Sequence, residues 1–144
     1  MAFAKFVATD QRPLPADWPT AESHLRRLSS GQTKSLSMGL TETGADTFFI
    51  ACFVKEPSGI YVSVRALADV EEFDLVEPHK ADDLIRCVIG GRSASAIRRG
   101  AIVDAAALML AARTFFERGE REATLHWRPS VELLQRLARG EHVG

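Results

Sequence analysis

The chain has 144 residues, a formal net charge of −1, and a composition of 46% hydrophobic and 26% charged residues. These values are typical of one folded domain and exclude a disordered chain. The nearly neutral charge gives no general attraction to nucleic acid or to an anionic membrane. No apolar run reaches the roughly 20 residues of a membrane span, and the N-terminus lacks the pattern of a secretory signal. We therefore expect residues 1–144 to form a single cytoplasmic domain.

The N-terminal segment is predicted to contain a strand, a loop and a short helix. Residues 3–10 are predicted to form a strand, and the following "RPLPADWP" an extended loop broken by prolines. Apolar residues recur at helical spacing over residues 20–28, with Asp17 or Thr20 as the cap. His24 lies on the apolar side of this helix, so we interpret it as a packing residue and not as a ligand.

Three strands are predicted next, over residues 33–40, 46–54 and 59–67. The links between them are short and carry turn-forming residues, which leaves no room for crossover helices. The three strands should therefore be antiparallel. Residues 46–54 form a nearly continuous apolar run, which predicts a central strand buried on both faces.

Two further short apolar segments follow at 72–79 and 83–91, and the second is predicted to be a strand. It ends at Gly90 and Gly91, which lack the spacing of a phosphate-binding loop and are interpreted as a turn or a bulge. The segment 95–103 fits either a strand or a loop.

The clearest predicted element is a helix from Asp104 to Arg118, because its apolar residues form one broad stripe. Asp104 suits the N-cap, and Gly119 suits the position after the last turn. A second amphipathic helix is predicted over residues 130–139. Ser130 is its expected cap, and one side carries Val131, Leu134, Leu137 and Ala138. The expected fold is α+β: an antiparallel sheet of about five strands, the long helix on one face, and shorter helices near both termini.

The stretch "VDAAALMLAARTFFERGEREATLHWRP" joins an alanine-bearing helix, a Phe-Phe pair, a glycine stop, a charged link and a tryptophan. With "FFIA", "GIYVSV" and "IRCVIGG" upstream, this order resembles the first-numbered immunity-protein family of bacterial polymorphic toxin systems. The resemblance covers residues 34–128, and the first thirty residues and the terminal helix carry no matching motif. The matching residues are Gly90, Gly91, Ala112, Phe116, Gly119 and Trp127. We expect these residues to be structural, with Phe116 and Trp127 in the core.

Members of that family are found beside genes for secreted toxins, including nucleases and a double-stranded-DNA cytosine deaminase. The resemblance implies a non-catalytic protein, without cofactor or metal, that neutralises one cognate toxin by occluding its active site. The implied partner is this secreted toxin, and neither nucleic acid nor a membrane is expected. A homodimer is left open.

Acidic residues are concentrated between Asp69 and Asp83, where seven acids face a single base, Lys80. This stretch fits either a solvated loop or a surface that meets a basic partner. Nuclease and deaminase toxins need basic grooves to hold phosphates, so carboxylates that mimic substrate charge would bind there. On this hypothesis the toxin-binding residues are Glu71, Glu72, Asp74, Glu77, Asp82 and Asp83.

Enzymatic alternatives have little support in the sequence. No hydrolase, zinc-protease or deaminase motif is present. His79 lies near two acids but without a second histidine at helical spacing, so we interpret it as part of a polar loop and not as a metal ligand. Cys87 with His126 could pair as nucleophile and base, but its apolar neighbours favour an inert thiol, and Cys52 is interpreted in the same way. The remaining alternatives are a regulatory interaction domain, which predicts self-association, and a small enzyme, which predicts a deep polar pocket.

Overall fold

Nine strands pair into one antiparallel sheet in the computed structural model, which describes residues 2–9, 13–41, 46–92 and 94–144. The strands are β1 (Phe6–Ala8), β2 (Pro13–Pro15), β3 (Ser35–Gly39), β4 (Phe48–Lys55), β5 (Gly59–Arg65), β6 (Phe73–Val76), β7 (Leu84–Ile89), β8 (Ala94–Arg98) and β9 (His126–Pro129). The helices are α1 (Trp18–Ser29), α2 (Ala105–Arg118) and α3 (Ser130–Ala138), with a 3-10 turn, η1, at Arg99–Ala101.

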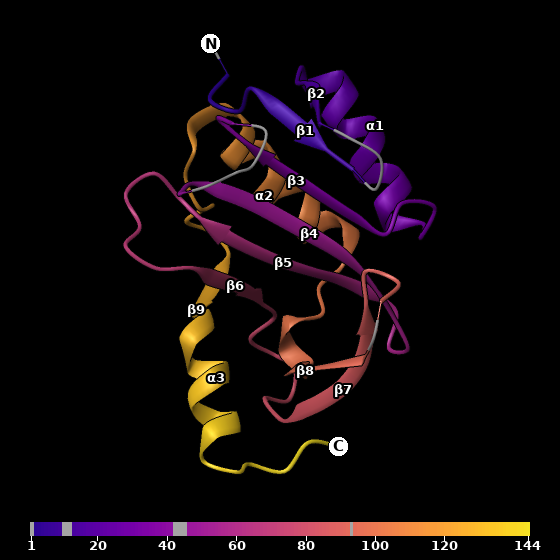
Figure 1. Ribbon diagram of the computed structural model, residues 1–144, viewed down its shortest axis with the longest axis vertical. Coiled ribbons are helices and arrows are strands. Elements are labelled where there is room, and N and C mark those ends of the chain that lie inside the picture. The colour runs from indigo at the N-terminus through magenta and orange to yellow at the C-terminus, as the bar shows by residue number, and fades with distance from the viewer. Residues whose placement is uncertain (1, 10–12, 42–45, 93) are drawn as a thin grey trace.

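The α+β class and the antiparallel pairing agree with the sequence prediction, but the sheet is larger than the expected five strands. Its main path runs β2-β1-β3-β4-β5-β6-β9. Beyond the end of β3, strand β4 pairs with β7 instead, through Val54 opposite Ile89 and Lys55 opposite Val88. Strand β8 completes a hairpin with β7, which lies at the lower end of the sheet in Figure 1. The additional strands are short, and long-range pairing decides whether such segments join a sheet.

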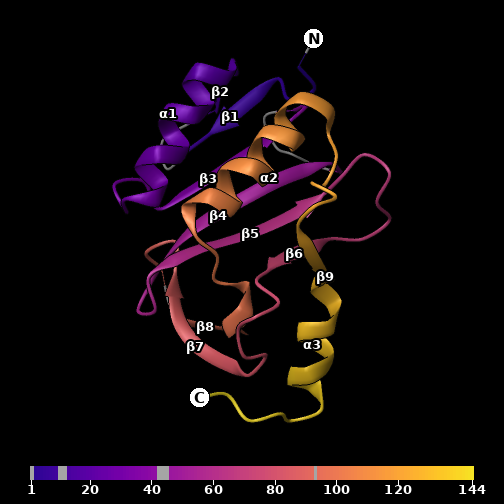
Figure 2. The same cartoon turned by 180° about the vertical axis from the view of Figure 1, so that it is seen from behind.

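Helices α1 and α2 cover one face of the sheet, and the other face carries no helix along most of its length (Figures 1 and 2). Strand β4 is central, as predicted, but the expectation that both its faces are buried is wrong. Phe49 and Ala51 are buried beneath the helices, whereas Ile50 and Cys52 point to the opposite face and are half-buried. The apolar run therefore predicted the central position of β4 correctly, but it did not show that the face of β4 opposite the helices is only partly buried.

Proline occurs in the strands at both ends of the main sheet path. Strand β2 contains Pro13 and Pro15, and strand β9 ends with Pro129. Proline has no N–H to donate, so these edges are poor templates for pairing with another sheet. The proline-broken loop expected over the first of these segments is thus an edge strand.

Helix α2 packs against β4 and β5, and its prediction is confirmed. The Asp104 side chain accepts from the Ala107 N–H at 2.8 Å, and the helix ends at Gly119 in a left-handed conformation with φ of 71°. The small side chain of Ala112 allows close approach to the sheet, and Phe116 is buried as expected. The buried side consists of Leu108, Ala111, Ala112, Phe115 and Phe116.

Helix α1 packs beside α2. Asp17 caps it, since its carboxylate accepts from the Thr20 N–H at 2.8 Å. The rings of Trp18 and Phe116 meet edge to face with their centroids 5.4 Å apart. His24 is half-buried, and burial, with a smaller effect of Arg27, lowers its pKa.

A smaller core lies under the β7–β8 hairpin, where Cys87 packs with Val54, Ile85, Ile97 and Ile102. The hairpin turns at Gly90 and Gly91, whose φ values of 64° and 71° confirm the predicted turn. Such positive values are strained for residues with a side chain, which explains the glycine pair.

Helix α3 continues directly from β9 and departs from the sequence prediction in two ways. Its apolar side is exposed, with Val131 at 45% and Leu134 at 64% of full exposure. Ser130 does not cap the helix, but donates a hydrogen bond of 2.8 Å to the Asp74 carboxylate. Polar contacts to the sheet and packing of Leu133 on the smaller core, rather than burial of the predicted apolar stripe, thus position α3. In the part of the chain that the structure describes, none of the helices has the length and apolar character needed to cross a bilayer.

Candidate functional site

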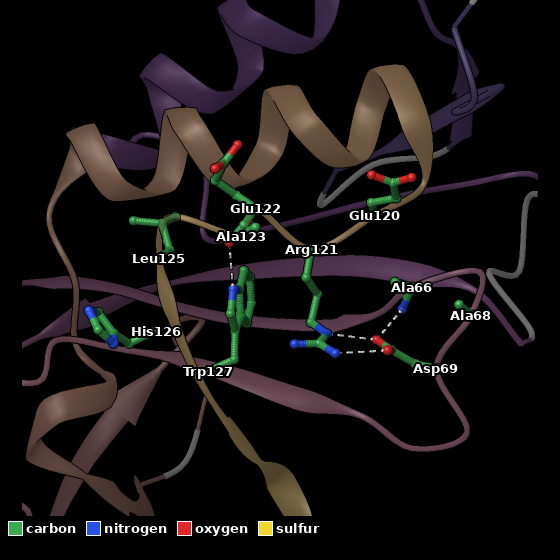
Figure 3. Close-up of a pocket in the computed structure, with 10 residues that line it drawn as sticks. All are labelled: Ala66, Ala68, Asp69, Glu120, Arg121, Glu122, Ala123, Leu125, His126 and Trp127. Atoms are coloured by element: carbon green, nitrogen blue, oxygen red, sulfur yellow. Dashed lines mark hydrogen bonds and ion pairs between the residues drawn. The ribbon is translucent and has the colours of Figure 1, made fainter.

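The link from α2 to β9, residues 119–125, folds over one end of the sheet. It forms one wall of a cavity of about 530 Å³ that is open to solvent. The loop between β5 and β6, residues 66–72, forms the opposite wall. Trp127, near the start of β9, lies between the two, and the exposed His126 lies at the edge of the cavity beside Leu125 (Figure 3). Two segments distant in sequence, residues 66–72 and 119–127, therefore meet at this site.

Arg121 is fixed on one side of the cavity by an ion pair and by aromatic stacking. Its Nε and Nη2 donate to the two carboxylate oxygens of Asp69 at 2.9 and 3.0 Å (Figure 3). Its guanidinium carbon lies 3.8 Å from the ring centroid of Phe73. Burial raises the pKa of Asp69, but the hydrogen bonds from Arg121 and from the Ala66 N–H outweigh it and leave that pKa lowered. The Arg121 charge is thus compensated within the protein.

Glu122 holds the link in place on the other side. Its carboxylate accepts from the Thr114 hydroxyl at 2.6 Å and from the Thr124 hydroxyl at 2.7 Å. These hydrogen bonds, led by Thr114, lower the pKa of Glu122 to about 2, so the group stays ionised near neutral pH. The carbonyl of Glu122 accepts from the Trp127 indole N–H at 3.0 Å, which fixes the orientation of the ring.

A second cavity, of about 340 Å³, adjoins the first and shares His126 and Trp127 with it. Glu77 and Asp82 line it, and these residues come from the connection between β6 and β7. Lys80 also contributes to this wall, and its ammonium donates to the Ile102 carbonyl at 2.5 Å. The two cavities together form a concave surface on both sides of β9.

Two of the six carboxylates predicted to bind a toxin belong to an internal polar network. Asp74 is only 1% exposed and accepts from the Tyr61 hydroxyl at 2.6 Å and from Ser130. Burial raises its pKa. Glu72 is half-buried and accepts from Ser63 at 2.5 Å. Asp74 therefore cannot contact a partner on the surface, because the sheet face and α3 enclose it.

The other four carboxylates differ in whether they form ion pairs with arginines of the same chain. Asp83 receives two hydrogen bonds of 2.9 Å from Arg99, and Asp82 lies 3.2 Å from Arg136 Nη1. Glu77 accepts from the His79 backbone N–H at 3.1 Å, and Glu71 is exposed. The structure therefore does not bring the six together as one free acidic surface.

Trp127 also differs from its prediction. It packs at the margin of the main core and remains half-buried, because one part of the ring lines the cavity. The prediction that Trp127 lies in the core is therefore confirmed only in part, whereas Phe116, at 3% exposure, is a core residue as predicted. The remaining matched residues have the structural positions expected of them.

Sequence reasoning missed the residues that form the first cavity, above all Glu120, Arg121 and Glu122. The signal was present in "ERE" (residues 120–122), a charged link that directly follows the glycine stop at Gly119 and precedes a tryptophan. Its charged residues were interpreted only as a connection. The cavity forms because Arg121 pairs with Asp69, a contact between positions 52 residues apart.

Cys87 and His126, which could pair as nucleophile and base, lie in different parts of the fold. Burial raises the pKa of the Cys87 thiol, which packs in the smaller core, whereas His126 lies on the edge strand β9. His79 is exposed on a loop, and Cys52 and Cys87 both keep thiol side chains. Over residues 2–9, 13–41, 46–92 and 94–144, no three His, Cys, Asp or Glu side chains are placed to hold a metal ion.

Comparison of the chain with family models, with curated proteins and with solved structures returns no match. The function must therefore be argued from the geometry and from the sequence pattern.

Proposed function

We propose that this protein is a non-catalytic immunity protein that binds and neutralises a cognate secreted bacterial toxin in the cytoplasm. The observation that carries the proposal is the concave surface around β9, where carboxylates from three separate segments surround two adjoining cavities. These carboxylates are Asp69, Glu77, Asp82, Glu120 and Glu122. Asp69 and Asp82 are already paired with Arg121 and Arg136, and Lys80 and Arg128 also line the second cavity, so Glu77, Glu120 and Glu122 supply the negative charge offered to a partner.

The physical basis is charge complementarity. A toxin that acts on nucleic acid holds phosphates in a basic groove, so a protein that presents carboxylates can occupy that groove and exclude substrate. Glu122 contributes a rigid negative charge, because its hydrogen bonds to Thr114 and Thr124 hold it in place and keep it ionised. Occlusion of this kind needs no reaction and no cofactor. A nuclease or a nucleic-acid deaminase is therefore the class of toxin that this surface fits.

The resemblance of residues 34–128 to immunity proteins supports the proposal independently. Ala112 and Phe116 form the buried side of α2, and Gly119 ends it in a left-handed turn. These residues build the link that carries Glu120 and Glu122, so the matched segment forms the framework of the proposed surface. The surface differs from the one expected from the acidic stretch alone, since Asp74 is inside the protein.

The test is protection of a cell from the toxin. The gene next to the one for this chain is inspected for a secreted protein with a C-terminal toxin domain, and that domain is expressed with and without this chain. We expect growth only in the presence of this chain, and a stable complex in size-exclusion chromatography. A toxin domain that kills cells equally well in both cases, and that elutes separately, overturns the proposal.

The exposed side of α3 favours one alternative, a regulatory domain that self-associates. Val131 and Leu134 are exposed apolar residues on one helix side, and exposed apolar patches often mark interfaces. This alternative predicts a homodimer in sedimentation velocity that Leu134→Glu converts to monomer. A wild-type protein that is monomeric at all concentrations contradicts it.

A further inference from the structure

We propose that the cavity between residues 66–72 and 119–125 is a socket for one arginine side chain of the partner protein. This inference rests on the proposed function and deepens it, because it names the chemical group that the surface receives. It stands on a cavity whose wall is partly apolar, with an aromatic ring of fixed orientation and carboxylates among the residues that line it (Figure 3).

The charges around the cavity favour a cation. Its described wall residues contribute three carboxylates, from Asp69, Glu120 and Glu122, and one guanidinium, from Arg121. Arg121 and Asp69 compensate each other through two hydrogen bonds, which leaves the negative charges of Glu120 and Glu122 to act on a ligand. A phosphate or another anion would meet these two carboxylates, so nucleic acid is a poor occupant.

The apolar part of the wall suits the aliphatic stem of a long cationic side chain. Leu125, Trp127 and Ala123 line the cavity, and Trp127 cannot turn freely because its indole N–H is bound to the Glu122 carbonyl. Long cationic side chains pack their methylene groups on apolar surface and keep the charged end near water or carboxylates. Figure 3 shows the Glu122 carboxylate above the Trp127 ring and turned away from it, toward Thr114 on α2, so it would act on a guanidinium at the ring through its charge and not as a direct hydrogen-bond acceptor.

Arginine fits this arrangement better than lysine. A planar guanidinium stacks on aromatic rings and donates in a fixed fork to a carboxylate, whereas a lysine ammonium is a compact and strongly hydrated charge. The protein already shows the same recognition internally, since Arg121 stacks on Phe73 and pairs with Asp69. A volume of about 530 Å³ is within the range of about 300–1,000 Å³ for small-ligand sites, so the cavity holds one side chain with water.

The test uses a small probe and needs no toxin. The ¹⁵N-labelled protein is titrated with N-acetyl-arginine amide, and the indole N–H signals are followed by NMR. The chain has two tryptophans, so Trp127 reports on the cavity and Trp18, on α1, is the internal control. We expect saturable movement of the Trp127 signal and a nearly constant Trp18 signal. N-acetyl-citrulline amide, a neutral analogue of the same shape, should bind roughly tenfold more weakly, since charge-assisted hydrogen bonds are the stronger ones.

Variants identify the carboxylates. Glu120→Gln combined with Glu122→Gln removes both charges while the side-chain sizes are kept, and should weaken arginine binding about as much as the citrulline substitution does. Glu22→Gln, on the exposed side of α1, is the matched control and should bind like the wild type. The position of the Trp127 signal without probe shows whether the link is still folded in the double variant. If the link is not folded, the single variant Glu120→Gln is used in its place. Equal binding of the arginine and citrulline probes, or wild-type binding by a folded charge variant, overturns the socket.

These results are separable from those on the proposed function. If the chain protects no cell but the arginine titration behaves as expected, the immunity proposal fails and the socket stands. If the chain protects cells and the two probes bind equally, the socket fails and the immunity proposal stands.

Discussion

Arg98 and Glu132 join α3 to the sheet through an ion pair whose partners differ strongly in exposure. Arg98 Nη2 lies 3.1 Å from Glu132 Oε1, and the side chains are 1% and 33% exposed. Arg98 Nε lies 3.5 Å from Asp82, but Nη1 has no hydrogen-bond partner among the residues that the structure describes. No residue of α3 is fully buried, so this pair is a main attachment of the helix.

We predict that Glu132→Gln destabilises the protein more than Arg98→Met does. Glu132→Gln leaves a buried guanidinium without its nearest compensating charge, and should lower the free energy of unfolding by about 1–3 kcal/mol. Arg98→Met replaces the buried charge by an apolar side chain, while Glu132 and Asp82 can be hydrated, so its effect should be about 1 kcal/mol or less. Urea unfolding monitored by circular dichroism measures both values. The opposite order would show that the ion pair itself supplies net stability.

A second prediction compares two glycines with the same backbone conformation. Gly119 and Gly140 have φ of 71° and 77°, but an added Cβ would lie 2.8 Å from the Phe3 ring at Gly119 and meets nothing within 4 Å at Gly140. Gly140→Ala should therefore lower the free energy of unfolding by only the left-handed strain, about 1 kcal/mol. Gly119→Ala should lower it by at least about 1 kcal/mol more, because Phe3 must move. Equal losses in urea unfolding would show that the Phe3 ring yields without loss of packing.

A third prediction follows from the different burial of two aromatic residues. Phe116 is 3% exposed and packs against Trp18, so Phe116→Ala should lower the free energy of unfolding by about 3–5 kcal/mol. Trp127 is half-buried, and Trp127→Ala should cost less because water already reaches part of the ring. Thermal unfolding of the two variants gives the comparison. A larger loss at Trp127 would contradict its position at the margin of the core.

The fourth prediction concerns Tyr61, the single tyrosine of the chain. Burial, and then the negative charge of Asp74, raise the pKa of its hydroxyl far above the ordinary value near 10. The folded protein should therefore show no phenolate absorbance near 295 nm as pH passes 10, whereas urea-unfolded protein should titrate normally. A pKa raised by folding gives stability that is present below about pH 10 and is lost as the pH rises further. Reversible phenolate formation in folded protein near pH 10 would disprove the burial of this hydroxyl.

Local sequence determined the elements whose causes lie within a few residues. The apolar stripe of residues 105–118, the Asp104 cap and the glycine stop at Gly119 predicted α2, and the structure confirms each of them. Alternation predicted the strands at β3 and β5, and short links predicted their antiparallel pairing through β4. Helical and strand periods depend on neighbouring positions of the chain, so the sequence alone carries this information.

Only the tertiary structure decided which faces of these elements are covered. The charged residues around Asp74 look alike in sequence, but this carboxylate is enclosed by Tyr61 and Ser130, whereas Glu71 is exposed. The apolar side of α3 predicted to face inward, with Val131 and Leu134, is exposed, because polar contacts and the packing of Leu133 on the smaller core set the orientation of the helix. The cavity at Trp127 arises where residues 66–72 and 119–125 meet. Burial of a side chain depends on what packs over it from distant segments, and a local pattern of apolar and charged residues does not contain that information.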